Sequence, residues 1–274
     1  MVGKAYWKGL CLPSILYAAE VIEYTDSEIN KLQVIENSVY RTILGARKFS
    51  PVATLRGEIG ASLMKSRIDK NKLNFVNGIL NLNRDDLVRR AMEWALHTNI
   101  GKWSRNVKNI LEKYEIDINN MNRGIIKDKI KLKDTIYWHE DMRDKNTLNI
   151  YKNYKEFREE SNLYDNTFSS EILYKLRSNT LELNKRIKFK ESDDETCPMC
   201  KINSEDLYHF ILFCPNLGII RNRNILLQYP LNENKEFIIK NFLFFDKPSN
   251  LEIKNTKLTI EMMWKERKRY VNTT

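Results

Sequence analysis

The sequence predicts a mainly α-helical protein, and three observations support this prediction. Glycine and proline are scarce, with 9 and 6 residues among 274, whereas β-sandwiches, barrels and propellers need turn residues about every 8–12 positions. Apolar residues recur at intervals of three and four along most of the chain, which is the period of one helix face. Helix-start signals precede several of these stretches. A chain of this length has room for one or two domains with a real hydrophobic core.

The first predicted helix covers about residues 6–21. Tyr6, Leu10, Pro13, Tyr17 and Val21 recur on one face, so we expect a packed helix. Pro13 is expected either to kink this helix or to mark its first turn, because proline lacks the N–H that a helix interior needs.

The next helices have recognisable ends. Thr25 and Glu28 form a capping box, and the helix that follows is expected to stop at Gly45. Ser50-Pro51 combines a cap residue with proline at the first helical position, and predicts a short helix that runs to about Gly60. Further helices are predicted over residues 64–82, 85–97 and 104–114.

The second half of the chain is more polar. Residues 117–160 are rich in lysine, asparagine and aspartate but keep several aromatic residues, so we expect a polar helical connector. Helical periodicity resumes between about 172 and 187. The tail carries an apolar stretch, 237–245, and a final amphipathic helix whose charged residues 265–269 are expected to be solvated.

The charge balance favours a polyanionic partner. Lysine and arginine exceed aspartate and glutamate by ten, and the sequence pI is about 9.3. An excess of this size suits RNA or DNA, and an anionic membrane surface is the alternative. No apolar run reaches the length of a membrane-spanning helix. Trp7, Lys8 and Pro13 interrupt the one segment that is similar to a signal peptide, so an intracellular protein, nuclear or cytoplasmic, is expected.

One cluster of residues has the spacing of a metal site: Cys197-x2-Cys200-x8-His209-x4-Cys214. Zn²⁺ prefers four thiolate or imidazole donors in a tetrahedron, and a two-residue gap lets one tight turn present two sulfurs to one ion. Oxidised cysteine pairs and coincidence are the alternatives. Because the protein would fill all four positions, this zinc would be structural.

Enzymatic chemistry is not indicated within this sequence. A closed four-donor site leaves no position for a catalytic water, which argues against a zinc hydrolase. The sequence contains neither a nucleophile elbow nor a glycine-rich phosphate loop, so no catalytic residue is expected.

Basic residues flank the cysteine cluster on both sides. A phosphate backbone could follow cations on either side of the cluster while an aromatic side chain stacks on a base. The alternative is an ordinary solvated face. The candidate contacts are Lys185, Arg186, Lys188 and Phe189 before the cluster, and Arg221 and Arg223 after it.

Several further segments carry a recognisable pattern, namely Trp7–Glu20, Leu32–Asn37, Tyr40–Gly45, Leu55–Gly60 and Leu176–Thr180 with Leu183 and Asn184. Together with the metal cluster, in the same order, they resemble the region that follows the polymerase core in non-LTR retrotransposon reverse transcriptases. The metal cluster with Cys214-Pro215, and Arg221 after it, resembles the zinc knuckle of that family. Together they cover about residues 5–80 and 170–225.

The departures from this family concern catalysis. The family's polymerase uses an aromatic-x-Asp-Asp turn to hold two metal ions, whereas Asp85-Asp86 and Asp193-Asp194 do not follow a hydrophobic strand. Some relatives carry a Pro-Asp nuclease motif after the knuckle, but here Pro248 is followed by Ser249-Asn250. The resemblance therefore implies a part of the enzyme that lacks both active sites and acts with a separate polymerase core.

These observations combine into one expectation. The resemblance implies a helical thumb-like domain (1–100), a polar helical connector (101–170), a CCHC zinc-knuckle region (171–225) and C-terminal helices (226–274). We expect the chain to bind RNA or DNA as a fragment of a reverse transcriptase. The alternative is a zinc-stabilised helical scaffold that binds a protein partner through the apolar stretch 237–245.

Overall fold

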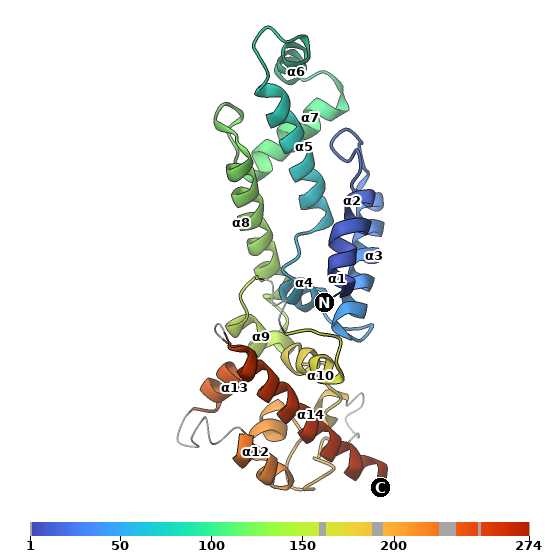
Figure 1. Ribbon diagram of the computed structural model, residues 1–274, viewed down its shortest axis with the longest axis vertical. Coiled ribbons are helices and arrows are strands. Elements are labelled where there is room, and N and C mark those ends of the chain that lie inside the picture. The colour runs from blue at the N-terminus through green and yellow to red at the C-terminus, as the bar shows by residue number, and fades with distance from the viewer. Residues whose placement is uncertain (1, 159–162, 188–193, 225–233, 246–247, 274) are drawn as a thin grey trace. The chain divides into compact units, whose positions relative to one another are not determined.

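The computed structural model consists of α-helices joined by turns, which confirms the predicted mainly α-helical class (Figure 1). It describes all residues except 1, 159–162, 188–193, 225–233, 246–247 and 274. Among the described residues, β pairing consists of an isolated bridge between Thr196 and Ser204. No helix in this part of the chain combines the length and the apolar character that crossing a membrane requires.

The chain forms two compact units. The N-terminal unit contains Val2–Val39 and Gly60–Arg143, and the C-terminal unit contains Tyr40–Ile59 and Asp144 onward. Helix α3, Asp26–Leu44, begins in the first unit and ends in the second. The other helices of the N-terminal unit are α1 (Val2–Tyr6), α2 (Leu12–Ile15), α5 (Met64–Leu80), α6 (Leu87–Thr98), α7 (Gly101–Tyr114) and α8 (Arg123–Met142). Those of the C-terminal unit are α4 (Val52–Ile59), α9 (Asn149–Tyr154), α10 (Phe168–Arg177), α11 (Asn184–Ile187), α12 (Gly218–Asn224), α13 (Lys235–Leu243) and α14 (Asn250–Thr273).

Local signals set several helix boundaries as predicted. The Thr25 amide donates to Glu28 Oε2 at 2.7 Å, and the Glu28 amide donates to Thr25 Oγ1 at 3.3 Å. Helix α3 then ends at Leu44. Gly45 follows with φ +59°, where a Cβ atom would lie 2.2 Å from Glu171 Cγ. Glycine is therefore required there for both its backbone angle and its small size.

The first helical stretch differs from the prediction. It contains a π-helical turn, Trp7–Cys11, and ends at Ile15, because Ala18 takes a left-handed backbone angle of +57°. Its buried aromatic residue is Trp7, whose indole donates to Glu36 Oε1 at 3.4 Å, and Lys4 of the same stretch is buried too. The residues expected on a packed face are instead exposed, namely Tyr6, Leu10, Tyr17 and Val21, with Pro13.

The N-terminal unit has a hydrophobic core of its own. Helices α7 and α8 pack against α5 in the N-terminal unit, around a core that includes Val76, Val107 and Ile126. The N-terminal unit therefore extends past residue 100 to Arg143. Helix α8 buries Trp138 completely and belongs to the N-terminal unit, whereas Asp144 and the residues after it belong to the C-terminal unit.

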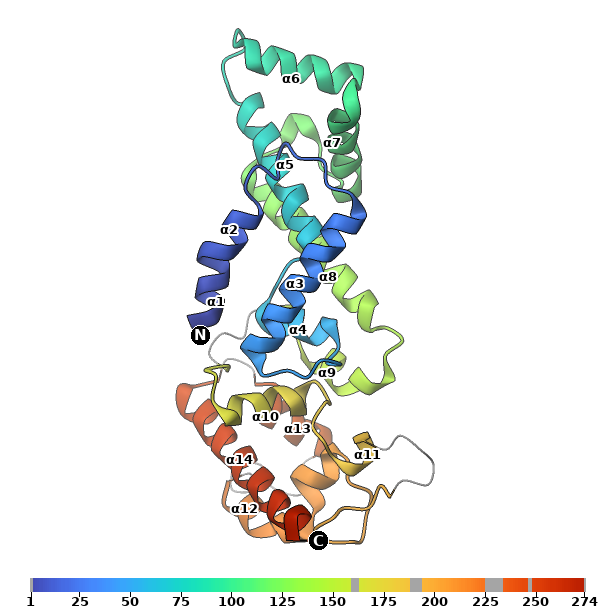
Figure 2. The ribbon, with the colours of Figure 1, turned by 90° about the vertical axis from the view of Figure 1, so that its right-hand side faces the viewer.

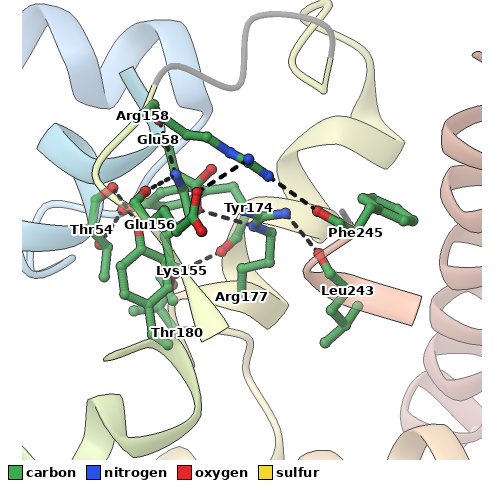
Figure 3. A network of polar contacts seen from close by, with 12 residues as sticks. Thr54, Glu58, Lys155, Glu156, Arg158, Tyr174, Arg177, Thr180, Leu243 and Phe245 are labelled. Carbon is green, nitrogen blue, oxygen red and sulfur yellow. Dashed lines mark hydrogen bonds and ion pairs between the residues drawn. The ribbon is translucent and has the colours of Figure 1, made fainter. Parts of the chain in front are cut away.

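A buried polar network organises the C-terminal unit (Figure 3). Arg177 Nε donates to Glu58 Oε1 at 3.0 Å and Arg177 Nη1 donates to the Leu243 carbonyl at 2.7 Å. Thr54 and Tyr174 share a hydrogen bond of 2.8 Å. These contacts explain why residues 40–59 belong with the C-terminal half of the chain. Helix α14 packs along α10 and α12 in this unit (Figure 2).

Candidate metal centre

Three cysteines and one histidine converge in the C-terminal unit. The donor atoms of Cys197, Cys200, His209 and Cys214 all lie within 4.8 Å of one another. Cys197 Sγ lies 3.8 Å from Cys214 Sγ, and Cys200 Sγ lies 3.4 Å from His209 Nε2. The residues that the sequence predicted as ligands are therefore brought together, and they could bind a metal ion.

The distance between two of the sulfurs fits a shared tetrahedral ion. Metal–sulfur bonds of about 2.3 Å at tetrahedral angles separate two sulfurs by about 3.8 Å, which is the distance between Cys197 and Cys214. A disulfide would require about 2 Å, and the cysteines of the described chain are free thiols. The donor set of three sulfurs and one imidazole nitrogen is that of a structural site.

A tight turn holds the first two ligands. The Cys197 amide donates to the Asn203 carbonyl at 2.8 Å, and the Lys201 amide donates back to the Cys197 carbonyl at 2.9 Å. Lys201 closes this turn with a φ of +56°. The isolated bridge between Thr196 and Ser204 joins the two arms of the loop. Cys197 and Cys200 thus lie on one rigid turn.

A capped helical segment holds the other two ligands. Asp206 Oδ1 accepts the His209 amide at 2.8 Å and so caps the segment that leads into a π-helical turn, His209–Phe213. The Cys214 amide donates to the His209 carbonyl at 2.8 Å. This i to i+5 hydrogen bond places the two ligands one wide turn apart on the same side.

The ligands are shielded from solvent. Cys197, His209 and Cys214 are buried, and Cys200 is partly buried. The hydrogen bond between the two close sulfurs raises the pKa of Cys197 and lowers the pKa of Cys214. A metal ion would displace both protons.

A buried arginine lies beside the cluster. Arg221 Nη2 donates to the Cys214 carbonyl at 2.6 Å, and burial lowers the pKa of this guanidinium while Cys214 opposes that effect. Three thiolates around a divalent ion carry a net charge of −1, so the positive Arg221 balances the occupied site. The structure thus places Arg221 against the metal ligands, where its side chain is 6% exposed, rather than on the surface.

The metal loops are joined to helix α14. Arg267 of α14 donates through Nε and Nη2 to the two oxygens of Glu205, at 2.6 and 2.7 Å. Glu205 Oε2 also accepts a hydrogen bond from the backbone N–H of Asn184 at 2.8 Å. The side-chain Nδ2 of Asn184 donates to the carbonyl of Thr196, the residue before Cys197. Phe210 packs edge-on against Trp264 with ring centroids 6.2 Å apart. Arg267 was expected to be solvated, and its burial corrects that expectation.

No protein-family model matches the chain, and neither a curated protein nor a solved structure is significantly similar to it. The resemblance to non-LTR reverse transcriptases therefore stays a prediction.

The remaining predicted contacts differ in their surroundings. Lys185 is exposed and forms an ion pair with Asp206 at 3.4 Å, and Arg223 is exposed on α12. Arg186 is half-buried and donates through Nε to the Asn179 carbonyl at 2.9 Å. Lys188 and Phe189 lie outside the described residues.

Sequence reasoning missed the residues that support the cluster. Arg267 was expected in a solvated charged tail, Asn184 was used only for the family resemblance, and Glu205 was assigned no supporting role. A buried ion pair between distant positions leaves no periodic signal in one sequence. The only available sign was an arginine, Arg267, inside the apolar repeat of the last helix.

Proposed function

We propose that this chain binds nucleic acid through a zinc-stabilised C-terminal unit, as a non-catalytic part of a non-LTR retrotransposon reverse transcriptase. The observation that carries the proposal is the convergence of Cys197, Cys200, His209 and Cys214 within 4.8 Å. The family knuckle that these residues resemble contacts nucleic acid, and a polymerase core in the same or another chain would supply catalysis.

Zinc is the metal that the donors favour. Thiolate and imidazole ligands in a tetrahedron suit Zn²⁺ better than the hard, oxygen-preferring ions. The four protein ligands would fill the tetrahedral coordination of the ion, so no position would remain for a catalytic water. With three of the ligands buried and Arg221 close by, the zinc would have a structural role. Zinc would stabilise loops that are rich in turns and poor in core of their own.

The charge of the chain supports a nucleic-acid partner. The net charge of +10 includes exposed Lys185 and Arg223 on either side of the cluster. Such cations bind phosphates by releasing counterions, which makes the affinity depend on salt. The scaffold alternative relied on the stretch 237–245. Most of that stretch is core, since Ile239, Phe242 and Leu243 are buried.

The test is a titration of the zinc-loaded full chain into fluorescently labelled RNA and duplex DNA. Anisotropy would be recorded at several salt concentrations, with and without a zinc chelator. We expect binding that weakens steeply with salt and is lost with the zinc. A chain that holds one zinc yet binds neither nucleic acid at low salt contradicts the proposal.

A further inference from the structure

A pocket of about 790 Å³ lies within the C-terminal unit, next to the metal loops. Its wall comes from three separate segments: the turn after α3, the residues around α11, and the last turns of α14. The cationic and aromatic side chains of its lining include Arg47, Phe49, Arg186, Trp264 and Lys268. Pockets of this size hold a small organic ligand, and a double helix is far too wide to enter one.

The lining is strongly basic. Among the described residues, four cations line the pocket, Arg47, Arg186, Arg267 and Lys268, against one carboxylate, that of Glu182. Glu182 pairs with Arg47, and Glu205, behind the wall, neutralises Arg267. Within the described part of the chain, the charges of Arg186 and Lys268 therefore remain as a positive excess. Arg186 uses only Nε in its hydrogen bond to Asn179, and a guanidinium has further N–H donors for a phosphate.

An exposed aromatic ring lies at the same pocket. Phe49 is 63% exposed, although phenylalanine is among the residues that are most often buried in folded proteins. The guanidinium of Arg47 lies 5.4 Å from its ring centroid and positions it. Across the pocket wall, Lys268 Nζ lies 5.7 Å from the Trp264 centroid. A stacking surface beside unbalanced cations is the combination that binds a base together with its phosphate.

We infer that this pocket holds an unpaired nucleotide of a bound RNA or DNA strand. Its base stacks on Phe49, and its phosphates face Arg186 and Lys268. This inference rests on the proposed function and adds the place where the strand is held and its single-stranded form.

The pocket is coupled to the metal loops. Asn184 is part of its lining, and Asn184 Nδ2 donates to the Thr196 carbonyl, which precedes Cys197. Arg267, also in the lining, holds Glu205 and Asn184 Oδ1. Loss of the metal would loosen the Thr196–Glu205 loop, and with it one wall of the pocket.

The test uses the full zinc-loaded chain and two fluorescein-labelled single-stranded probes, a uridine 12-mer RNA and a thymidine 12-mer DNA, and compares them with a labelled DNA duplex of the same length. The variants are Phe49→Leu, which removes the stacking ring, and Lys268→Ala, which removes one cation. Matched controls in the same unit are Phe237→Leu, an aromatic residue 48% exposed on α13, and Lys254→Ala, an exposed lysine near the start of α14. Zinc content and helical circular dichroism must equal the wild type in all four variants.

We expect Phe49→Leu to weaken binding of the preferred probe roughly tenfold at every salt concentration. Lys268→Ala should lower the slope of log affinity against log salt by about 0.7, the value for one phosphate contact of a single strand. Both controls should match the wild type. The RNA and DNA probes then show which strand the pocket prefers.

Three results would overturn the inference, and they differ in what they say of the function. If the wild type binds and both pocket variants bind as tightly with an unchanged salt slope, the strand lies elsewhere and the proposed function stands. If zinc-loaded wild type binds neither probe nor duplex, the function and the pocket fail together. Preference for duplex over both 12-mers would also contradict a pocket for an unpaired nucleotide.

Discussion

Arg267 and Glu205 are separated by 62 positions in the sequence, yet their side chains form a two-point ion pair inside the C-terminal unit. The side chain of Glu205 is fully buried, and that of Arg267 is 6% exposed. One carboxylate thus joins the last helix to the loops that carry the metal ligands. Arg267 also holds the side chain of Asn184, because Arg267 Nη2 donates to Asn184 Oδ1 at 3.1 Å.

Replacing Arg267 by methionine should destabilise the chain by about 3–5 kcal/mol, because Glu205 would remain as an unpaired buried charge. Urea denaturation followed by circular dichroism measures this change. The double variant Glu205→Gln with Arg267→Met should recover part of the loss. Arg269→Met is the matched control on the same helix, since its partner Glu266 forms an exposed pair that is worth at most about 1 kcal/mol. Equal effects of the two arginine substitutions would contradict this prediction.

Arg177→Met should be destabilising for the same reason, by about 3–5 kcal/mol. It removes the bonds to Glu58 and to the Leu243 carbonyl, and both side chains of the ion pair are buried. Lys175→Met, two residues earlier on α10, removes only a partly exposed pair with Glu171. We expect that control to stay within about 0.5 kcal/mol. Thermal and urea unfolding of both variants distinguish the two outcomes.

Cys200→Ser should abolish tight zinc binding, because a neutral hydroxyl replaces one of four strong donors. Elemental analysis of the purified protein measures zinc per chain, with about one expected for the wild type and nearly none for the variant. Cys11→Ser is the control, since Cys11 lies in the N-terminal unit, far along the chain from the cluster. Full zinc occupancy in Cys200→Ser would remove Cys200 from the ligand set.

Asp165 should titrate well below an ordinary aspartate. Burial alone would raise its pKa, but hydrogen bonds from Thr167 and Lys257 outweigh burial and lower the pKa from 3.8 to about 2. A folded-state pKa below the unfolded value stabilises the fold above about pH 3.8, and this contribution is lost as the pH falls toward 2. NMR titration of the carboxyl carbon measures the shift directly. Lys257→Met should bring the pKa back toward 3.8, and an unchanged value would show that Lys257 has no part in it.

Features of this fold that depend on neighbouring residues were predictable from the sequence. The capping box of Thr25 and Glu28, the stop at Gly45 and the start at Ser50-Pro51 each involve a few adjacent positions. The metal cluster belongs to the same class, since its ligands lie within 18 consecutive residues and their spacing alone fixes a loop and a helical turn.

Features that depend on distant partners were not predictable. Whether Arg267 is solvated or buried is decided by Glu205, and whether 40–59 joins one half of the chain or the other is decided by Tyr174 and Arg177. The apolar period of the first helical stretch was visible, but the face that packs holds Trp7 and not Tyr6 or Leu10. Period alone does not reveal which side of a helix meets a neighbour.

The C-terminal unit is built from two stretches of sequence that are separated by residues 60–143, and this affects how the chain folds during synthesis on the ribosome. Glu58 and Thr54 emerge about 120 residues before Arg177 and Tyr174, their partners in the same unit. The whole of 60–143 is made in between and has its own core to form. Helix α4 therefore cannot form its buried contacts until the second half of the chain has been translated. For the same reason, a fragment cut at residue 144 would carry the metal ligands but lack Glu58, so expression of this region on its own requires residues 40–59 to be supplied with it.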